Sequence, residues 1–277
     1  MNKNTSAFLL AVSCNDVFAP DNKTDSSPLL KGHAFTVIKA VQAVNKRLVG
    51  LNESDTLLFE VILLGTDCEE HIKTKIADSA THYGLEIGKF CFCSRADLAK
   101  TLQANHIKLF LSTDREDVYS SLQAGIPAAF LYKQTDQQVL DQLRVLFSGD
   151  LIGLPEDSIN CLKDLGFDDV QIQNFNASKG FMREFAVLIG NMRRRFGHEG
   201  SPLRTSLMTV CGSNDVCVSA LKTLRDWGVE VDEAYCLAGA PDSPILSVLQ
   251  PHILWDIGLQ KVKGVDSLMR VSSQTLK

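Results

Sequence analysis

Short apolar runs alternate with amphipathic segments along the whole chain, and this alternation constrains the fold more than any other feature. The apolar runs have the length and composition of β-strands that are apolar throughout rather than on one side. We expect strands at Phe8–Val12, Leu57–Leu64, Ile107–Leu111, Ala128–Leu131, Arg144–Phe147, Thr205–Val210, Ala234–Leu237 and His252–Trp255. Strands of this kind are buried on both faces, which is typical of parallel sheets covered by helices. The pattern therefore predicts an α/β fold with a doubly wound parallel sheet, whose sites lie beyond the carboxyl ends of the strands.

The segments between these runs have the apolar spacing of amphipathic helices. We expect helices at Ala34–Val49, Glu69–His82, Arg95–Ala104, Arg115–Ala124, Glu156–Leu165, Lys179–Arg195, Asn214–Trp227 and Pro244–Leu249. The polar stretch KQTDQQVLDQ (133–142) is the best boundary between two parts of the chain. We therefore expect an N-terminal α/β half over 1–135 and a C-terminal half over 136–277. VILLGTD (61–67) and SLMTVCGSND (206–215) end in a similar way, which favours two halves of similar architecture.

Charge and cysteine usage limit the cellular setting. The formal net charge of −5 and the charged fraction of 22% argue against nucleic acid or an acidic membrane surface as a partner. No apolar span reaches 18 residues, and the N-terminal apolar core is too short for a signal peptide. The eight cysteines are scattered without a CxxC motif, so reduced thiols are favoured over zinc, even at Cys91 and Cys93. These features predict a soluble cytoplasmic protein.

Polar residues follow three of the expected strands in the C-terminal half. They are Ser148 and Asp150 in LFSGDLIGL (146–154), Thr209, and Asp256 after the apolar HILW. Because the carboxyl ends of parallel strands share one edge of a sheet, we expect these residues to converge. Carboxylates, a hydroxyl, a lysine and a metal ion at such an edge can perform phosphoryl transfer. Structural roles are the alternative: Asp150 can cap the following turn, and Thr209 is a good strand former.

Four segments carry a resemblance to a known family. They are GHAFTVIKAVQAVNKRL (32–48), LFLSTDREDVYSSLQAGIPAA (109–129), PLRTSLMT with ALKTLRDWGVEVDEAYCLAGAP (202–209 and 220–241), and QPHILWDI (250–257). Together they resemble the cytosolic 5′-nucleotidase 1 family of the haloacid-dehalogenase-like superfamily. The resemblance implies a Rossmann-like fold of that superfamily and magnesium-dependent hydrolysis of nucleoside 5′-monophosphates such as AMP.

The resemblance also assigns roles to the strand-end residues of the C-terminal half. The family segment FDGDAVLF carries the aspartate that attacks phosphorus and binds the metal, and this position is Ser148 here. Asp150 matches the second aspartate, the general acid and base. Thr209 matches the phosphate-binding threonine, whereas the arginine two positions later is replaced by Cys211. The family's catalytic pattern is therefore only partly present at the first two strand ends.

The third and fourth motifs of the family are also altered. The lysine of LAGAPKGP is replaced by Asp242, which sets a negative charge where a cation should meet the phosphate. The paired carboxylates of FDD become LWDI, which keeps Asp256 as a metal ligand and puts Ile257 beside it. Lys179 and Lys222 are expected on solvated helix surfaces. Magnesium binding is therefore doubtful in this chain, because too few anionic oxygens remain for it.

These replacements favour a catalytically impaired or inactive pseudoenzyme that acts by binding or by assembly. Its partner would be a nucleotide held without turnover, a second copy of the chain, or an active paralogue in a hetero-oligomer. The alternative is an active but altered 5′-nucleotidase or phosphatase that uses Asp150 and Asp256. A third hypothesis is a nucleotide sensor site in the N-terminal half. The hydroxyl of Ser148 favours the first hypothesis, because it is neutral at pH 7 and attacks only with the help of a base.

Overall fold

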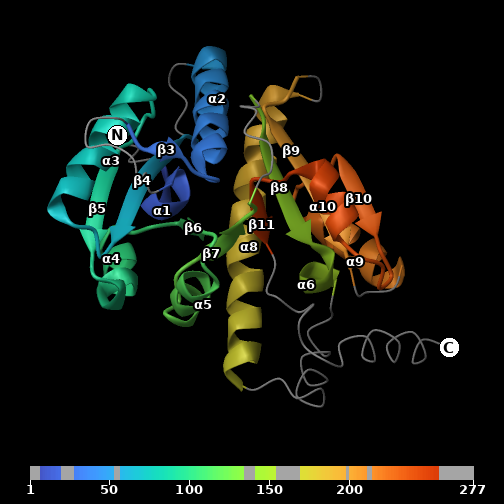
Figure 1. The fold of residues 1–277 in the computed structure, drawn as a ribbon. Helices are drawn as coiled ribbons and strands as arrows, with labels where there is room; N and C mark the ends of the chain where they lie inside the picture. The colour runs from blue at the N-terminus through green and yellow to red at the C-terminus, as the bar shows by residue number, and fades with distance from the viewer. Residues whose placement is uncertain are drawn as a thin grey trace, which may run out of the picture. The chain divides into compact units, whose positions relative to one another are not determined.

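The computed structural model describes residues 7–19, 28–52, 57–133, 141–153, 169–197, 200–210 and 214–255. The chain divides into two compact units (Figure 1). Unit 1 comprises Met1–Leu143 and Arg195–Pro202, and unit 2 comprises Arg144–Arg194 and Leu203–Lys277. The helix expected at Glu156–Leu165 lies outside the described residues, as do Cys211, Asp256 and Ile257.

Unit 1 is built on five parallel strands. They are β1 (Phe8–Ser13), β4 (Phe59–Thr66), β5 (Lys89–Cys93), β6 (Leu109–Ser112) and β7 (Ala128–Leu131). Their order is β7-β6-β1-β4-β5, so the chain first moves from β1 to one side and later returns to the other. β1 lies at the centre, and its residues Ala11 and Val12 are fully buried. This is the doubly wound arrangement that the alternating sequence pattern predicts.

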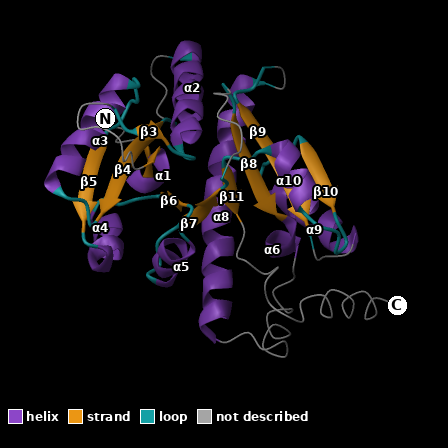
Figure 2. Cartoon of the chain, viewed as in Figure 1, coloured by secondary structure: helices purple, strands orange, loops and turns teal. Residues whose placement is uncertain are grey.

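Helices connect the strands of unit 1. They are α1 (Cys14–Val17), α2 (Phe35–Leu51), α3 (Glu70–His82), the short 3₁₀ turn η1 (Arg95–Asp97), α4 (Leu98–Ala104) and α5 (Arg115–Gln123) (Figure 2). A two-stranded ribbon, β2 (Phe18–Ala19) with β3 (Leu30–Lys31), follows α1. α2 buries Val37, Val41, Val44 and Leu48, which recur at the three- and four-residue spacing of one helix face.

The described part of unit 2 has four strands in the order β10-β9-β8-β11. The strands are β8 (Leu143–Ser148), β9 (Leu203–Thr209), β10 (Glu233–Cys236) and β11 (Ile253–Trp255). The described helices of unit 2 are α6 (Gly149–Gly153), α8 (Asp169–Phe196), α9 (Asn214–Asp226) and α10 (Ser243–Leu249). β10 pairs with β9 and β11 with β8, both in parallel. The long helix α8 packs on this sheet through Phe185, whose ring centroid lies 5.9 Å from that of Trp255. Both side chains are buried.

The predicted α/β class and parallel sheet are confirmed, and each expected strand overlaps an observed one. β5 was not among the expected strands. It is an outer strand in the order of unit 1, and its residues Lys89 and Phe92 are less buried than those of β1. α8 begins ten residues before the expected start at Lys179. Among the described helices, none has the length and apolar composition that crossing a bilayer requires.

Candidate functional site

Ser148 is the last residue of β8, and its side chain forms a hydrogen bond with the backbone of α6, the helix that follows. Its Oγ accepts a hydrogen bond from the Leu151 N–H at 3.4 Å. This is the geometry of an N-cap residue, whose oxygen satisfies an N–H group in the first turn of a helix. Among the described residues, no acidic, basic or histidine side chain hydrogen-bonds to the Ser148 hydroxyl. The serine is therefore positioned as a cap for α6, without a neighbouring base.

Asp150 lies in the first turn of α6, yet its carboxylate reaches across to another strand. Its Oδ2 accepts a hydrogen bond from the Val210 N–H at 2.7 Å, and the side chain is buried. Val210 directly follows β9, so the carboxylate joins the ends of β8 and β9. This contact spans 60 residues of sequence and is not the local turn cap that was considered for Asp150.

Thr209 is the last residue of β9 and is fully buried. No partner for its Oγ1 lies within the described part of the chain. The backbone of Gly149 lies against this oxygen, because a Cβ added at Gly149 would be 2.1 Å from it. A glycine is thus required for β8 and β9 to end so close together. The structure therefore brings Ser148, Asp150 and Thr209 to one edge of the sheet.

The remaining predicted site residues follow β9, β10 and β11. Asp242 is the N-cap residue of α10, where its backbone carbonyl accepts from the Leu246 N–H at 2.9 Å. Its carboxylate makes no hydrogen bond or ion pair with any described residue. Asp256 and Cys211 lie outside the described residues. The strand before Asp256 ends at Trp255, which is paired with Phe147 of β8.

The described side chains do not fit a magnesium ion. Mg²⁺ takes oxygen ligands and is held by carboxylates in proteins. At this edge the described residues supply the neutral hydroxyl of Ser148 and the carboxylate of Asp150, which already accepts from Val210. Over the described ranges, no group of three or more His, Cys, Asp and Glu side chains is arranged to hold a metal ion. We therefore derive no metal-dependent step from these residues.

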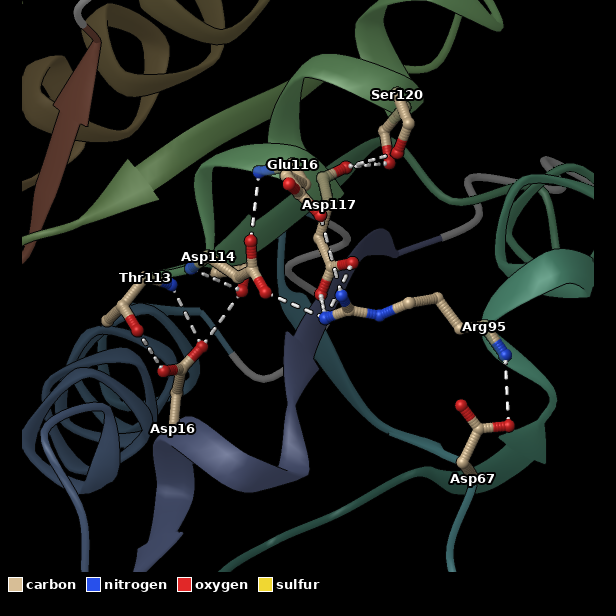
Figure 3. Close-up of polar contacts among 10 residues, drawn as sticks. Asp16, Asp67, Arg95, Thr113, Asp114, Glu116, Asp117 and Ser120 are labelled. Atoms are coloured by element: carbon tan, nitrogen blue, oxygen red, sulfur yellow. Dashed lines mark hydrogen bonds and ion pairs between the residues drawn. The ribbon is translucent and has the colours of Figure 1, made fainter.

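A second polar cluster, which sequence reasoning did not single out as a site, lies in unit 1 (Figure 3). Asp16 of α1 accepts hydrogen bonds from Ser112 Oγ at 3.1 Å and from the Thr113 N–H at 2.9 Å. β1 and β6 are neighbours in the sheet, and the chain leaves them in opposite directions. Such a point, where the strand order reverses, is where open α/β sheets commonly bind ligands. The signal in the sequence is the polar stretch Ser112-Thr113-Asp114, which begins at the last residue of β6.

Arg95 holds the acidic residues of this cluster together (Figure 3). Its guanidinium lies 2.7 Å from Asp114 and 3.3 Å from Asp117. Burial raises the pKa of Asp117 above its ordinary value, although Arg95 opposes the change. Burial acts in the same direction on Asp114, but hydrogen bonds from Arg95 and the Glu116 N–H hold its pKa below the ordinary value. The polar groups of this cluster are thus paired with one another.

Comparison with known proteins agrees with the family resemblance of the sequence. A family model described as 5′-nucleotidase matches residues 17–273. The chain is also 33% identical over 256 residues to cytosolic 5′-nucleotidase 1B of Homo sapiens. The match covers 88% of this chain and 42% of the human protein, so the chain spans less than half the length of that relative.

Proposed function

Because the chain belongs to the 5′-nucleotidase family, we propose that it keeps the family's nucleotide-handling scaffold in the cytosol but hydrolyses nucleoside 5′-monophosphates weakly or not at all. It then acts by binding a nucleotide or by assembling with a second copy or an active relative. The observation that carries the proposal is the hydroxyl of Ser148 at the end of β8, where the family resemblance implies a nucleophilic aspartate.

The chemistry of serine supports this proposal. A hydroxyl is uncharged at pH 7, so it neither attracts a divalent cation nor attacks phosphorus without a base. The hydroxyl of Ser148 accepts a hydrogen bond from Leu151, and no described side chain is placed to take its proton. Removing one member of a concerted catalytic group typically lowers the rate by ~10⁴–10⁶. Replacing the nucleophilic aspartate with Ser148 is therefore sufficient to remove ordinary turnover.

The other strand ends support the same conclusion. The carboxylate of Asp150 is buried and accepts from Val210, so its charge already stabilises the backbone. Asp242 stands where the resemblance implies a lysine. Losing one preorganised charge stabiliser lowers a rate by roughly 10²–10³. A negative charge at this position also opposes the approach of a phosphate dianion.

The test measures phosphate release by the purified full chain from a panel of nucleoside 5′-monophosphates with magnesium. We expect a rate at least about 10⁴-fold below that of an active 5′-nucleotidase assayed in parallel. A rate within about 100-fold of that enzyme would contradict the proposal. A thermal-shift titration with AMP, with and without magnesium, then distinguishes a protein that binds nucleotide from one that acts only by assembly.

The alternative function is an altered hydrolase that uses Asp150 and Asp256. The burial of Asp150 beside Thr209 favours it, because a buried carboxylate at a strand end is a suitable general base. Asp150→Asn separates the two functions. The asparagine oxygen can still accept from Val210, so the fold is kept while the carboxylate is lost. If the wild-type chain turns over substrate and Asp150→Asn does not, the altered hydrolase is the better account.

A further inference from the structure

A cavity of about 180 Å³ lies on one face of the unit 2 sheet, near the beginnings of its strands. Its polar lining comes from Arg144 of β8, Arg204 and Ser206 of β9, and Glu233 and Tyr235 of β10. The two polar residues from β9 are two positions apart, and so are the two from β10. Side chains two positions apart point to the same face of a strand, so the polar lining lies on one face of the sheet. Arg144 precedes Ser148 by four residues of extended chain, roughly 13 Å. The cavity is therefore separate from the candidate site at the other ends of the strands.

Arg144 is a partly buried cation without an anionic partner among the described residues. Its Nη1 donates to the backbone oxygen of Leu249 at 2.9 Å, whereas its Nε is buried and has no partner. Burial and the nearby Arg204 lower the pKa of Arg144 below its ordinary value. A buried charge is unfavourable unless it is paired, so this guanidinium lies in an environment that an anion would improve.

The charges that line the cavity do not balance. Arg204 forms an ion pair with Glu233, and Glu233 also accepts a hydrogen bond from Tyr235 Oη at 3.0 Å. Two guanidinium groups therefore face one carboxylate, and that carboxylate is already shared between Arg204 and Tyr235. The lining therefore has an excess of one positive charge.

We infer that this cavity binds an oxyanion, a phosphate or carboxylate group, between Arg144 and Arg204. A guanidinium presents its N–H groups in a planar fork that matches two oxygens of such a group. Arg144 and Arg204 both line the cavity, and Ser206 lines it with them. The inference does not rest on the proposed function, because it needs neither Ser148 nor any catalytic residue.

The experiment is isothermal titration calorimetry on the full chain at low ionic strength. Inorganic phosphate, AMP and citrate are titrated separately, which distinguishes a free phosphate ion, a phosphate ester and a carboxylate. We expect Arg144→Gln and Arg204→Gln each to weaken binding by about 10- to 100-fold, since each removes charge-assisted hydrogen bonds. The matched control is Arg225→Gln, an exposed arginine of α9, which should leave binding unchanged.

Glu233→Gln gives a prediction of the opposite sign. It removes the carboxylate that competes for Arg204, so we expect binding to become about five-fold tighter or more. A gain of affinity also shows that the variant is folded. The inference is wrong if no oxyanion binds below about 10 mM, or if Arg144→Gln and Arg204→Gln bind like the wild type. It is equally wrong if Glu233→Gln does not tighten binding, or if Thr209→Val abolishes binding that Arg144→Gln leaves intact.

Discussion

His252 is a single buried residue that links pH to the stability of unit 2. Its Nδ1 accepts a hydrogen bond from the Arg144 backbone N–H at 3.1 Å, and its Nε2 has no partner within the described residues. Burial, and secondarily Arg144, lower the pKa of His252 to about 4. The imidazole is therefore neutral in the folded protein at pH values where an unfolded histidine is already protonated.

Because the pKa of His252 is lower in the folded chain than in the unfolded chain, we expect acid to destabilise the folded protein. The unfolded chain takes up a proton at His252 as the pH falls through about 6.5, whereas the folded chain does so only near pH 4. Stability is therefore lost as the pH falls between these values, by roughly 3 kcal/mol in total. In urea unfolding between pH 7.5 and 4.5, His252→Asn should flatten this dependence, because its Oδ1 can replace Nδ1 but does not titrate. The exposed His71→Asn is the control, and an equal slope in wild type and His252→Asn would refute the assignment.

At the same scale, the sequence predicted that Ser148, Asp150 and Thr209 would lie at one edge of the sheet, but not which contacts they would make; Asp256 lies outside the described residues. Ser148 and Thr209 end adjacent parallel strands, and strand ends share an edge whatever the loops do. The partner of Asp150 was not predictable, because the bond to the Val210 N–H joins residues 60 positions apart. The partial burial of Arg144 was not predictable for the same reason, since it depends on contacts with α10 and β9. The catalytic roles assigned to Ser148, Asp150 and Thr209 remain predictions.

At the scale of elements, α8 shows how closely a helix can approach its neighbours. A Cβ added at Gly190 would lie 2.5 Å from the backbone oxygen of Gly228, which follows α9. One turn further along, Arg193 donates to both carboxylate oxygens of Asp232. Burial would raise the pKa of Asp232, but the hydrogen bond from Arg193 and that from the Thr205 N–H hold it below its ordinary value. Glycine and arginine together fix the second half of α8.

Two glycines of α8 form a matched pair for testing this packing. Gly190→Ala should lower the free energy of unfolding by about 1–3 kcal/mol, because the added methyl group meets backbone that cannot turn aside. Gly180→Ala meets nothing within 4 Å and should raise it by about 0.5–1 kcal/mol through helix propensity. Urea unfolding of both variants checks the prediction. Equal effects would show that the close approach at Gly190 is unimportant.

Most helices and strands were predictable because each has its own spacing of apolar residues, which can be read from the residues of that segment alone. β1 and residues 61–64 of β4 form apolar runs that are easily recognised. β5 was missed although residues 90–93 are also apolar, because this run of four residues is short and the strand is an outer one that is only partly buried. The early start of α8 at Asp169 was also missed, since the polar residues of its first turns weaken the amphipathic pattern.

At the scale of the whole molecule, the scaffold is that of the family, whereas the catalytic roles of the strand-end residues stay predictions. Each unit has a parallel sheet with its own core, and unit 2 orders its strands so that β8 lies between β9 and β11. Composition and period predicted the α/β class and the parallel sheet, but not this strand order. They carry no information on turnover, because polar residues at strand ends can change while the apolar pattern stays the same.

Restoring the replaced groups together is the corresponding test. We expect the triple variant Ser148→Asp, Asp242→Lys and Ile257→Asp to release phosphate from AMP at least about 100-fold faster than the wild type. Ser148→Asp alone should gain much less, because catalytic groups that act as a unit are not additive. The measurement is single-turnover phosphate release with magnesium. A triple variant that folds but gains nothing would show that the loss lies elsewhere in the chain.

The close approach of Gly149 to Thr209 has a consequence for how such chains evolve. A side chain at 149 would collide with a neighbouring strand, and Asp150 anchors that strand, so selection for a stable fold is by itself a reason to keep both residues, whether or not the chain hydrolyses phosphate esters. Packing alone therefore accounts for the Gly149-Asp150 pair, and the pair is no evidence of turnover. A motif search that scores these two positions detects the packing of the sheet edge as well as its chemistry.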